Sequence, residues 1–477
     1  MPPALATTAR AQRSVIVITG AALFMVVLDN LIVASTLPSI QRSLGSSLGS
    51  LEWVLNAYIL AFAVLMLTAA ALGDRYGRRR VFIAGVVVFS LASAAGALAP
   101  SVGVLVAARA VQGIGGAVIM PLTLTLLGAA FPAERRAAAV GTWSAISMLG
   151  VALGPIAGGV LASALSWHWI FWVNVPIGVV VALLAPRILA ESRGPAERLD
   201  LGGLGLVSAG LLVVVWATVR ANAVGWGSPQ TLLTLAAGAA LLGGFLAWER
   251  RVERPMMPLR LFSSREFSAV NAAGFLLTFA MFGAFIMIVQ FLSGVRGESP
   301  VSTGVHMLFW TLMPMLVAPY AARLAQRVAP ATLIAAGLTV VTTGLLTLSA
   351  TISPDASALS LAPGLLITGA GIGLTIPNLA GGALAAVTPA DMGKASGILA
   401  TARQVGAVFG VSIGVAIFEA ASHGAAAADL SAGVRASILT AAGIALLGAV
   451  VTAASRTTSA WAPARAAVAW VRASGGA

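Results

Sequence analysis

The sequence predicts an all-α integral membrane protein with fourteen transmembrane helices, built as two pseudo-symmetric six-helix bundles with two helices inserted between them. Composition is the first observation behind this prediction. Of 477 residues, 59% are hydrophobic and 9% are charged, and the mean hydropathy is +0.98, whereas soluble domains carry about 25% charged residues. The number of long apolar runs and an internal repeat are the other two observations.

The apolar runs define the expected helices. A helix that crosses a bilayer needs about 20 mostly apolar residues, and fourteen runs meet that requirement. We expect them at approximately residues 15–38, 52–72, 80–99, 103–128, 138–162, 167–187, 201–220, 230–248, 267–292, 302–322, 331–350, 361–387, 395–420 and 435–455.

Basic side chains lie in short clusters between these runs. If both termini are cytoplasmic, three of the 28 Lys and Arg lie in outer loops, three lie within or at the end of spans, and the remaining 22 lie in inner segments. This asymmetry follows the positive-inside rule and predicts a multi-pass protein of the cell membrane with both termini cytoplasmic. The net charge of +13 therefore needs no nucleic-acid partner, which would require a basic face on a soluble domain.

Residues suited to metal or redox chemistry are few. Cysteine is absent, and His168, His306 and His423 are scattered along the chain. We therefore expect no disulfide, no thiol chemistry and no metal site, because such sites need closely spaced ligands. We also expect no cofactor and no catalytic residues, and we expect a monomer surrounded by membrane lipid.

An internal repeat divides the chain. Residues 113–121 read GIGGAVIMP and residues 369–377 read GAGIGLTIP, so two glycines and a proline recur at an offset of 256. Duplicated halves are the usual build of a secondary transporter. Spans 1–6 then match spans 9–14. The predicted parts are an N-terminal bundle (1–190), two inserted helices with flanking loops (191–265), a C-terminal bundle (266–456) and a cytoplasmic tail (457–477).

Glycine and proline are frequent in the apolar run GVALGPIAGG at residues 150–159. In a helix interior they cost about 1 and 3 kcal/mol, so this helix needs a compensating contact. GxxxGxxxG spacing puts three glycines on one face and lets another backbone approach closely. The notable residues of the run are Gly150, Gly154, Pro155, Gly158 and Gly159, and the offset of 256 gives a second face at Gly406, Gly410 and Gly414. We expect these faces to form two seams where the halves meet and part.

Six stretches carry a recognisable order of residues. They are VLDNLIVASTLPSI (27–40), LGDRYGRRR (72–80), ARAVQGIGGA (108–117), GVALGPIAGG (150–159), WHWIFWVNVPIG (167–178) and RQVGAVFG (403–410). Together they resemble the motifs of the fourteen-span drug:H+ antiporters (DHA2) of the major facilitator superfamily, although Ala70 stands where the loop motif usually begins with glycine. The resemblance implies alternating access between two six-helix bundles, and export of a small molecule in exchange for protons.

Two ionisable residues at membrane depth, Asp29 in span 1 and Arg109 in span 4, are the candidates for proton coupling. Charges inside a bilayer are costly and usually functional. Asp29 lies about 13 Å and Arg109 about 9 Å from the outer ends of their spans, at a rise of about 1.5 Å per residue, so they can pair directly or through water. We predict that Asp29 carries the proton and that Arg109 tunes it. The alternative is a static ion pair that locks the two spans together.

The connection between spans 2 and 3 is the second candidate site, formed by Asp74, Arg75, Gly77, Arg78 and Arg79. Gly77 permits the tight turn between antiparallel helices, and the arginines fix the topology. The resemblance implies in addition an inner gate, whose charges pair across the inner face while the outside is open and separate as the transporter turns inward.

Span 13 holds two further ionisable residues. Glu419, at its outer end, either binds a cationic substrate or extends into water. Arg403, about two turns inside the span, either pairs across the cavity, contacts an anionic group or reaches the cytoplasmic interface. Both are candidate polar sites of the second half.

These observations predict a proton-driven efflux antiporter for hydrophobic or amphipathic small molecules such as drugs, antibiotics or secondary metabolites. Aromatic residues and methionines of the spans suit such substrates, although a stripe of this kind more often serves packing. An importer or uniporter of a small metabolite is the alternative, because antiport rests on the resemblance alone. A membrane-embedded enzyme is a remote alternative, since no acidic cluster that could hold Mg2+ and a diphosphate lies beside any span.

Overall fold

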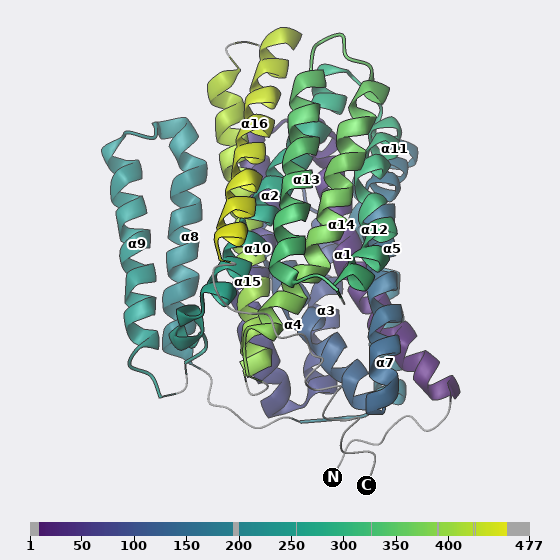
Figure 1. Cartoon of the computed structure of the whole chain (residues 1–477). Helices are drawn as coiled ribbons and strands as arrows, with labels where there is room; N and C mark the ends of the chain where they lie inside the picture. Colours follow the sequence, from purple (N-terminus) through teal and green to yellow (C-terminus); the bar gives the residue numbers. More distant parts are fainter. Residues whose placement is uncertain are drawn as a thin grey trace.

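The computed structural model describes residues 9–193, 200–253, 255–325, 327–388, 391–422, 424 and 426–455, and those residues form a bundle of long helices without a strand (Figure 1). The predicted tail at 457–477 and His423 lie outside the described residues. Each of the fourteen predicted spans has a helical counterpart, which confirms the predicted fold class.

The N-terminal bundle contains seven helical segments. They are α1 (Ala9–Leu44), α2 (Leu48–Tyr76), α3 (Arg78–Ala97), α4 (Val102–Ala130), α5 (Ala133–Ala164), α6 (Trp169–Trp172) and α7 (Asn174–Ile188). Serine side chains cap several of the helix starts: Ser47 and Ser101 accept backbone N–H groups of the first turns of α2 and α4, which satisfies donors that have no partner within the helix.

The remaining helices form the inserted pair and the C-terminal bundle. The inserted pair is α8 (Leu201–Val224) and α9 (Pro229–Glu249). The C-terminal bundle comprises η1 (Leu259–Ser263), α10 (Arg265–Gln290), η2 (Phe291–Val295), α11 (Pro300–Thr311), α12 (Met313–Leu324), α13 (Pro330–Thr351), η3 (Ala358–Leu361), α14 (Ala362–Ala385), α15 (Met392–Ala421) and α16 (Ala427–Ala454).

Two predicted spans are interrupted helices. The span expected at 167–187 divides into α6 and α7, and the span expected at 302–322 divides into α11 and α12 at Leu312. Pro314 explains the second break, because proline has no N–H to donate and its ring clashes with the preceding turn. Conversely, α1 continues past Pro38, where we expected it to end. Buried Leu37 and Ile40 on either side of that proline hold the helix against the bundle.

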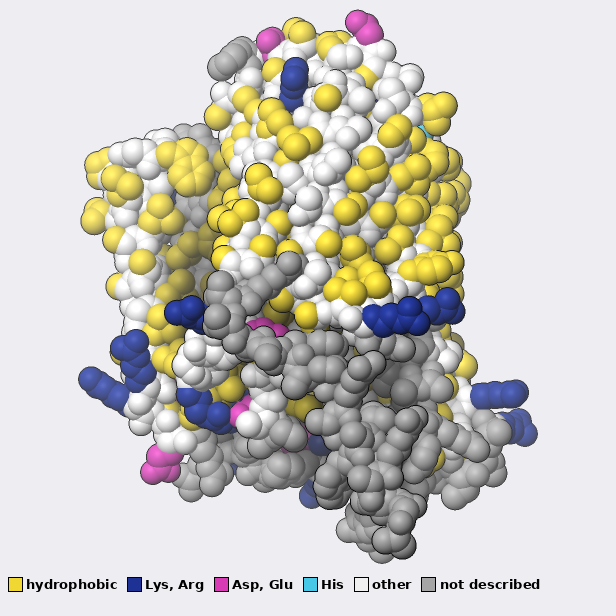
Figure 2. Space-filling view, in the orientation of Figure 1, with side chains coloured by type: hydrophobic (Ala, Val, Ile, Leu, Met, Phe, Trp, Pro, Cys, Tyr) yellow, Lys and Arg dark blue, Asp and Glu magenta, His cyan; other side chains and the backbone are white. Residues whose placement is uncertain are grey.

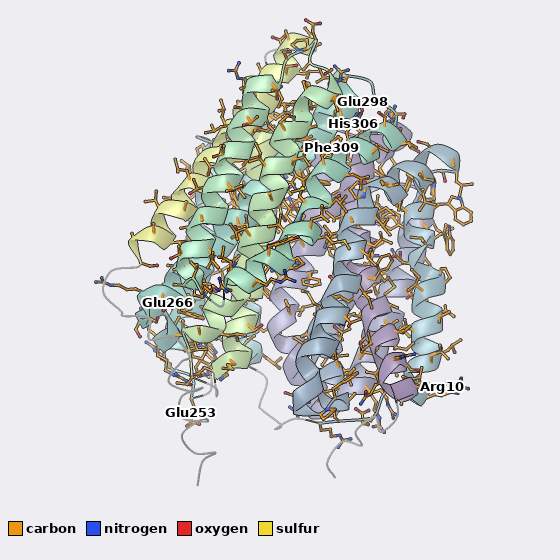
Figure 3. The ribbon with its side chains drawn as sticks, turned by 45° about the vertical axis from the view of Figure 1, so that its right-hand side comes forward. Arg10, Glu253, Glu266, Glu298, His306 and Phe309 are labelled. Atoms are coloured by element: carbon orange, nitrogen blue, oxygen red, sulfur yellow. The ribbon has the colours of Figure 1, made fainter. Side chains whose placement is uncertain are left out.

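Successive helices run in opposite directions between two ends of the molecule. We call the end with Arg10 the basic end, and the end with Glu298 and His306 the distal end (Figure 3). Figure 2 shows Lys and Arg side chains mainly toward the basic end and hydrophobic side chains over the face between the two ends. This distribution fits the charge asymmetry of the sequence.

The outer surface of the bundle suits lipid. Thirteen described helices are long and apolar enough to cross a membrane. The remaining span is α5, whose described apolar part runs Leu149–Ala164. Large hydrophobic side chains point outward, including Leu91, which is 66% exposed, and Leu233, which is 70% exposed. Soluble proteins rarely expose wide apolar surfaces, so this is a multi-pass membrane protein.

The glycines of the sequence repeat make equivalent contacts between helices in the two halves. A Cβ added at Gly113 would lie 2.4 Å from the Tyr58 carbonyl oxygen of α2, and one added at Gly369 would lie 2.4 Å from the Trp310 carbonyl oxygen of α11. The two glycines therefore bring equivalent helices of the two halves into backbone contact. Gly115 of α4 approaches Phe89 of α3, and Gly371 of α14 approaches Val341 of α13, which is a second equivalent pair of contacts.

The inserted helices lie to one side of the bundles, with α9 outermost (Figure 1). Only α8 of the two contacts both bundles extensively, through α2 and α15. The rings of Trp53 of α2 and Trp216 of α8 pack at an angle of 48° with their centroids 5.7 Å apart. Both line an apolar groove of about 950 Å3 between α2, α4 and α8. Helix α8 thus covers the line where the bundles meet on this side.

An ion pair joins η1 to the start of α15 at the basic end. The Arg260 guanidinium donates to both carboxylate oxygens of Asp391, at 2.9 and 2.7 Å, and Thr388 Oγ1 donates to the same carboxylate at 2.9 Å. Donation from Arg260 holds the pKa of Asp391 below its usual range. The pair lies outside the membrane spans and stabilises the folded C-terminal bundle only while Asp391 is ionised.

Acid should therefore remove the stabilisation that this pair provides. Because the pKa of Asp391 is lowered in the folded state, the contribution is present above the unfolded value of about 3.9 and is lost as the pH falls through the folded pKa. We expect the protein to have a higher Tm than Arg260→Gln at pH 6, and the difference to shrink below pH of about 4. Thermal unfolding in detergent across pH 3–7 measures this, with exposed Arg265→Gln as control. A Tm difference that stays constant over the range would contradict it.

Candidate functional site

Asp29 and Arg109 meet at the centre of the N-terminal bundle. Arg109 Nη1 of α4 donates to Asp29 Oδ2 of α1 at 2.5 Å, and both side chains are fully buried. Of the two arrangements that their depths allowed, a direct pair or a water-bridged one, the structure has the direct pair. A buried ion pair is tolerated only when further hydrogen bonds satisfy the remaining polar atoms.

The second carboxylate oxygen of Asp29 accepts two amide donors. Gln112 Nε2, one turn after Arg109 on α4, and Asn174 Nδ2, at the start of α7, each donate to Asp29 Oδ1 at 2.8 Å. Asn174 Nδ2 also contacts Ser93 Oγ of α3 at 3.1 Å. The carboxylate thus accepts three hydrogen bonds, a geometry that suits its ionised form.

Arg109 has partners that do not depend on Asp29. Its Nε donates to the Val54 carbonyl of α2 at 3.0 Å, and Nη1 also donates to Gln112 Oε1 at 2.7 Å. The Tyr58 ring lies under the guanidinium, 4.1 Å from its carbon to the ring centroid. Carbonyl and π-face contacts stabilise a buried cation. None of these three contacts of the guanidinium involves the Asp29 carboxylate.

Sequence reasoning missed the residues that complete this network. Gln112 lies three residues after Arg109, which places both on one face of a helix, and that spacing could have identified it. Asn174 belongs to the stretch WHWIFWVNVPIG, but nothing in the sequence places its amide beside Asp29. The burial of Tyr58 under Arg109 depends on the packing of α2 on α4, which the sequence does not specify.

The 72–80 connection forms its ion pairs within the N-terminal part of the chain. Arg78 Nε donates to Asp74 Oδ1 at 2.7 Å, and Glu191 Oε1, just after α7, accepts the Arg79 backbone N–H at 3.0 Å. Gly77 has φ 109°, where a side chain would be strained and would meet the Glu191 carboxylate. Arg75 is exposed and lies over the Tyr76 ring. Among the described residues, none of these charges pairs with the C-terminal bundle.

The glycine faces join helices within each bundle, so the prediction that they form seams between the halves is wrong. Gly150, Gly154 and Gly158 of α5 contact α1, through Phe24, Leu31 and Ile32 among others. Gly406, Gly410 and Gly414 of α15 contact α10 in the same way, through Phe275, Phe279 and Gly283. Glycine spacing predicts a close backbone approach, but it does not say which helix approaches.

The contact between the bundles uses a neighbouring face of the same motif. A Cβ added at Gly159 would lie 2.3 Å from the Pro300 carbonyl oxygen of α11, and one added at Gly304 of α11 would lie 2.4 Å from the Pro155 carbonyl oxygen. The backbones of α5 and α11 therefore touch near the distal end. Only Gly159 and Pro155 of the predicted motif face the other half.

The second-half candidates differ in their surroundings. The stem of Arg403 packs beside Gly274 of α10, and its Nε is buried without a hydrogen-bond partner. Its backbone carbonyl accepts from Thr278 Oγ1 at 2.6 Å. Glu419 lies exposed at the distal end of α15. The aromatic residues Phe285 of α10 and Trp310 of α11 are buried and pack edge to face.

Comparison with known proteins identifies the family. The family model of the Major Facilitator Superfamily matches residues 19–411, most of the chain. The chain belongs to this superfamily. This is a family of transporters, which points away from an enzyme.

Relatives within the major facilitator superfamily carry resistance and export names. The chain is 37% identical over 406 residues to "Multidrug resistance protein Stp" of Mycobacterium tuberculosis, covering 85% of this chain and 75% of the relative. It is 38% identical over 427 residues to "Puromycin resistance protein pur8" of Streptomyces alboniger, covering 87% and 83%. "Tetracenomycin C resistance and export protein" of Streptomyces glaucescens is 35% identical, with 82% and 72% covered.

Solved major facilitator structures share the fold. A POT family transporter in complex with a thioalcohol-conjugated peptide has a TM-score of 0.71 at 14% identity, with 93% of this chain and 96% of that chain covered. The human organic anion transporter MFSD10 (TETRAN) has a TM-score of 0.65 at 16% identity, with 92% and 99% covered. At these identities the likeness concerns the fold alone.

Proposed function

We propose that the protein exports hydrophobic or amphipathic small molecules, such as drugs or antibiotics, in exchange for protons. The relatives named for resistance and export support the export direction and the kind of substrate. The excess of Lys and Arg at the basic end supports a cytoplasmic position for that end and an extracellular position for the distal end, in the cell membrane.

The observation that carries proton coupling is the fully buried Asp29 with its three hydrogen bonds. Arg109 keeps the Val54 carbonyl, the Gln112 amide oxygen and the Tyr58 ring when Asp29 takes up a proton. A static ion pair would need no such independent support for the cation. Rotation of the Asn174 amide would present Oδ1, which is buried without a partner, as an acceptor for the protonated carboxyl.

Alternating access would then follow from the two kinds of contact between helices. The glycine faces hold α1 to α5 and α10 to α15, so each bundle moves as a unit. The contact of Gly159 with Pro300 opens and closes between the bundles at the distal end. The charges at 72–80 would serve as the gate at the basic end, and Arg403 is a candidate contact for a polar group of the substrate.

Transport into proteoliposomes with an imposed pH gradient tests this function. A panel of lipophilic cations and neutral antibiotics is offered, and uptake is compared for the unmodified protein, Asp29→Asn and the exposed control Asp355→Asn. We expect gradient-driven flux that collapses with the gradient, a loss of at least tenfold for Asp29→Asn, and normal flux for Asp355→Asn.

The same assay separates the competing functions. Flux that is indifferent to the pH gradient would indicate a uniporter, and flux in the direction of proton flow would indicate an importer. Full coupled transport by Asp29→Asn would show that another group carries the proton.

A further inference from the structure

A second acid is buried between the bundles. Glu52 lies one turn into α2 at the distal end, its side chain is 2% exposed, and both of its carboxylate oxygens are buried without a hydrogen-bond partner. An isolated ionised carboxylate is very costly in such a place, because no donor replaces the water that it loses. The hydrogen bonds that satisfy the buried carboxylate of Asp29 do not extend to Glu52.

Glu52 lies on the face of α2 that meets the other bundle. Four residues further along that face, Asn56 Nδ2 donates to Ser412 Oγ of α15 at 2.8 Å. Two turns beyond Asn56, the Ala63 carbonyl accepts from Thr401 Oγ1 of α15 at 3.4 Å. At about 3.6 residues per turn, Glu52, Asn56 and Ala63 form one stripe.

The matching stripe on α15 ends at Glu419. Thr401, Ser412 and Glu419 are separated by 11 and 7 residues, which also places them on one helix face. The two helices are antiparallel, so Glu52 lies about 6 Å and Glu419 about 10 Å beyond the Asn56–Ser412 contact, toward the distal end, at a rise of about 1.5 Å per residue. Glu419 therefore lies just above Glu52, at the exposed mouth of the contact.

No counter-ion compensates Glu52 among the described residues. Glu419, at the end of the matching stripe on α15, carries a charge of the same sign and cannot serve as a counter-ion. Arg220 of α8 is exposed and lies over the Trp216 ring. Arg42 of α1 is exposed and donates to the Pro38 carbonyl. On α4, Arg109 is held by Asp29.

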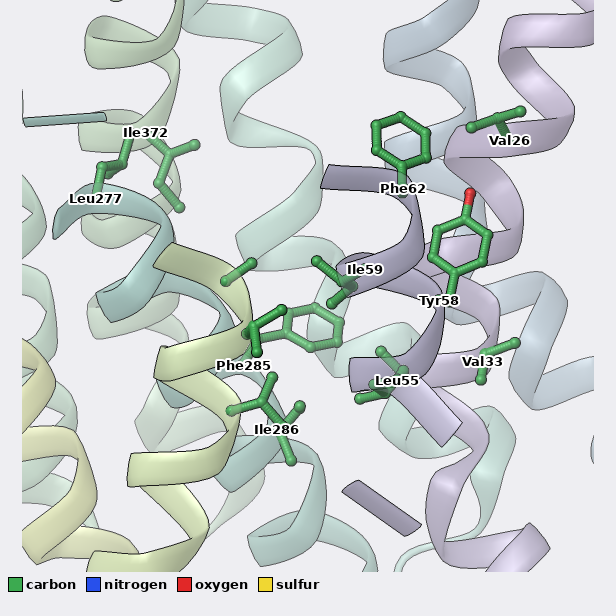
Figure 4. Packing of buried hydrophobic residues seen from close by; sticks show 14 of the residues in the cluster. Val26, Val33, Leu55, Tyr58, Ile59, Phe62, Leu277, Phe285, Ile286 and Ile372 are labelled. Atoms are coloured by element: carbon green, nitrogen blue, oxygen red, sulfur yellow. The ribbon is translucent and has the colours of Figure 1, made fainter. Parts of the chain in front are cut away.

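The surrounding contact between the bundles is otherwise apolar. Leu55 and Ile59 of α2 are buried, and Figure 4 shows Phe285 of α10 pointing toward them from the other bundle. Both carboxylate oxygens of Glu52 are buried without a hydrogen-bond partner beside these apolar side chains, so a proton on Glu52 is the simplest way to make its burial tolerable. Separation of α2 from α15 would hydrate Glu52 and remove that requirement.

We propose that Glu52 is a proton-binding site separate from Asp29, which controls closure of the distal end. The contact of α2 with α15 closes when Glu52 holds a proton. It opens when Glu52 releases the proton toward Glu419 and the distal solvent, because two neighbouring carboxylates then repel each other across the contact. This inference rests on the proposed alternating access, but not on Asp29 as the carrier.

Distances between spin labels test the proposal, and the absence of cysteine from the chain simplifies the labelling. Gly49→Cys on α2 and Ala420→Cys on α15 place a label on each side of the mouth. The label distance is measured in nanodiscs from pH 5 to pH 9 without substrate. We expect a short distance at low pH and a growing population of a longer one at high pH.

Four variants decide the result. Glu52→Gln is expected to keep the short distance at all pH values, and Glu419→Gln, on an exposed position, to weaken the pH response. Asp29→Asn is expected to retain the response, as is Glu249→Gln, which alters a buried glutamate held by the Met257 N–H of another region. A response unaltered by both Glu52→Gln and Glu419→Gln would overturn the proposal. A response lost with Asp29→Asn alone would overturn it too, yet leave the proposed antiport intact.

Discussion

Replacing Arg109 by methionine is expected to destabilise the folded protein by roughly 3–5 kcal/mol, because it leaves Asp29 as an uncompensated charge in a dry site. Methionine fills most of the space of the arginine stem, so lost volume contributes little. The lost stability comes from the contact of α1 with α4, where Asp29 accepts hydrogen bonds from Arg109 and Gln112. Thermal unfolding in detergent at pH 7 measures the effect, with the exposed Arg42→Met as control.

A double variant distinguishes the destabilisation caused by the uncompensated charge from that caused by the changed side-chain shape. In Asp29→Asn with Arg109→Met, no buried charge is left, and the asparagine oxygen still accepts from Gln112 and Asn174. We expect this variant to be more stable than Arg109→Met alone, since replacing a buried pair as a whole is often nearly neutral. It should nevertheless show no substrate transport driven by a proton gradient. Equal stability of Arg109→Met and Arg42→Met would refute the account of the buried pair.

The sequence was sufficient for the fold and for the central pair. Fourteen apolar runs, their charge asymmetry and the offset of 256 lead to two matched bundles, because a helix that crosses a bilayer needs about 20 mostly apolar residues. Asp29 and Arg109 stand out for the same reason: a charge within such a run is rare. Their partner Asn174 does not stand out, since an amide at the start of a helix has many ordinary roles.

The sequence could not predict which helices pack against each other, and the features it missed depend on that packing. The spacing of Gly150, Gly154 and Gly158 predicts that another helix packs closely against α5, but it does not identify that helix. In the structure it is α1 of the same bundle. Glu52 lay at the predicted first residue of span 2, where a glutamate normally reaches water. Only the packing of α15 against α2 turns that position into a buried one.

Adding a single methyl group at Gly159 is expected to hinder closure of the distal end without unfolding either bundle. In Gly159→Ala, the new Cβ would lie 2.3 Å from the Pro300 carbonyl oxygen, where ordinary contact begins at 3.4 Å. Both atoms belong to rigid helix backbones, so the bundles must separate. A cost of about 1–3 kcal/mol for overpacking corresponds to a fall of about 5- to 150-fold in the closed population.

The neighbouring glycines supply the comparison that makes this prediction specific. Gly158→Ala presses on Ser35 and Ile32 of α1 within one bundle, so it should lower the Tm and leave the distal contact in place. Gly443→Ala on α16, with no atom within 4 Å of its Cβ, should change neither. Spin labels attached through Ala164→Cys on α5 and Val305→Cys on α11 should move apart only in Gly159→Ala, and the same variant should transport less substrate. If Gly159→Ala lowers the Tm as Gly158→Ala does while the label distance stays short, the methyl group is being accommodated inside the bundle. The contact of α5 with α11 would then not be the closure of the distal end.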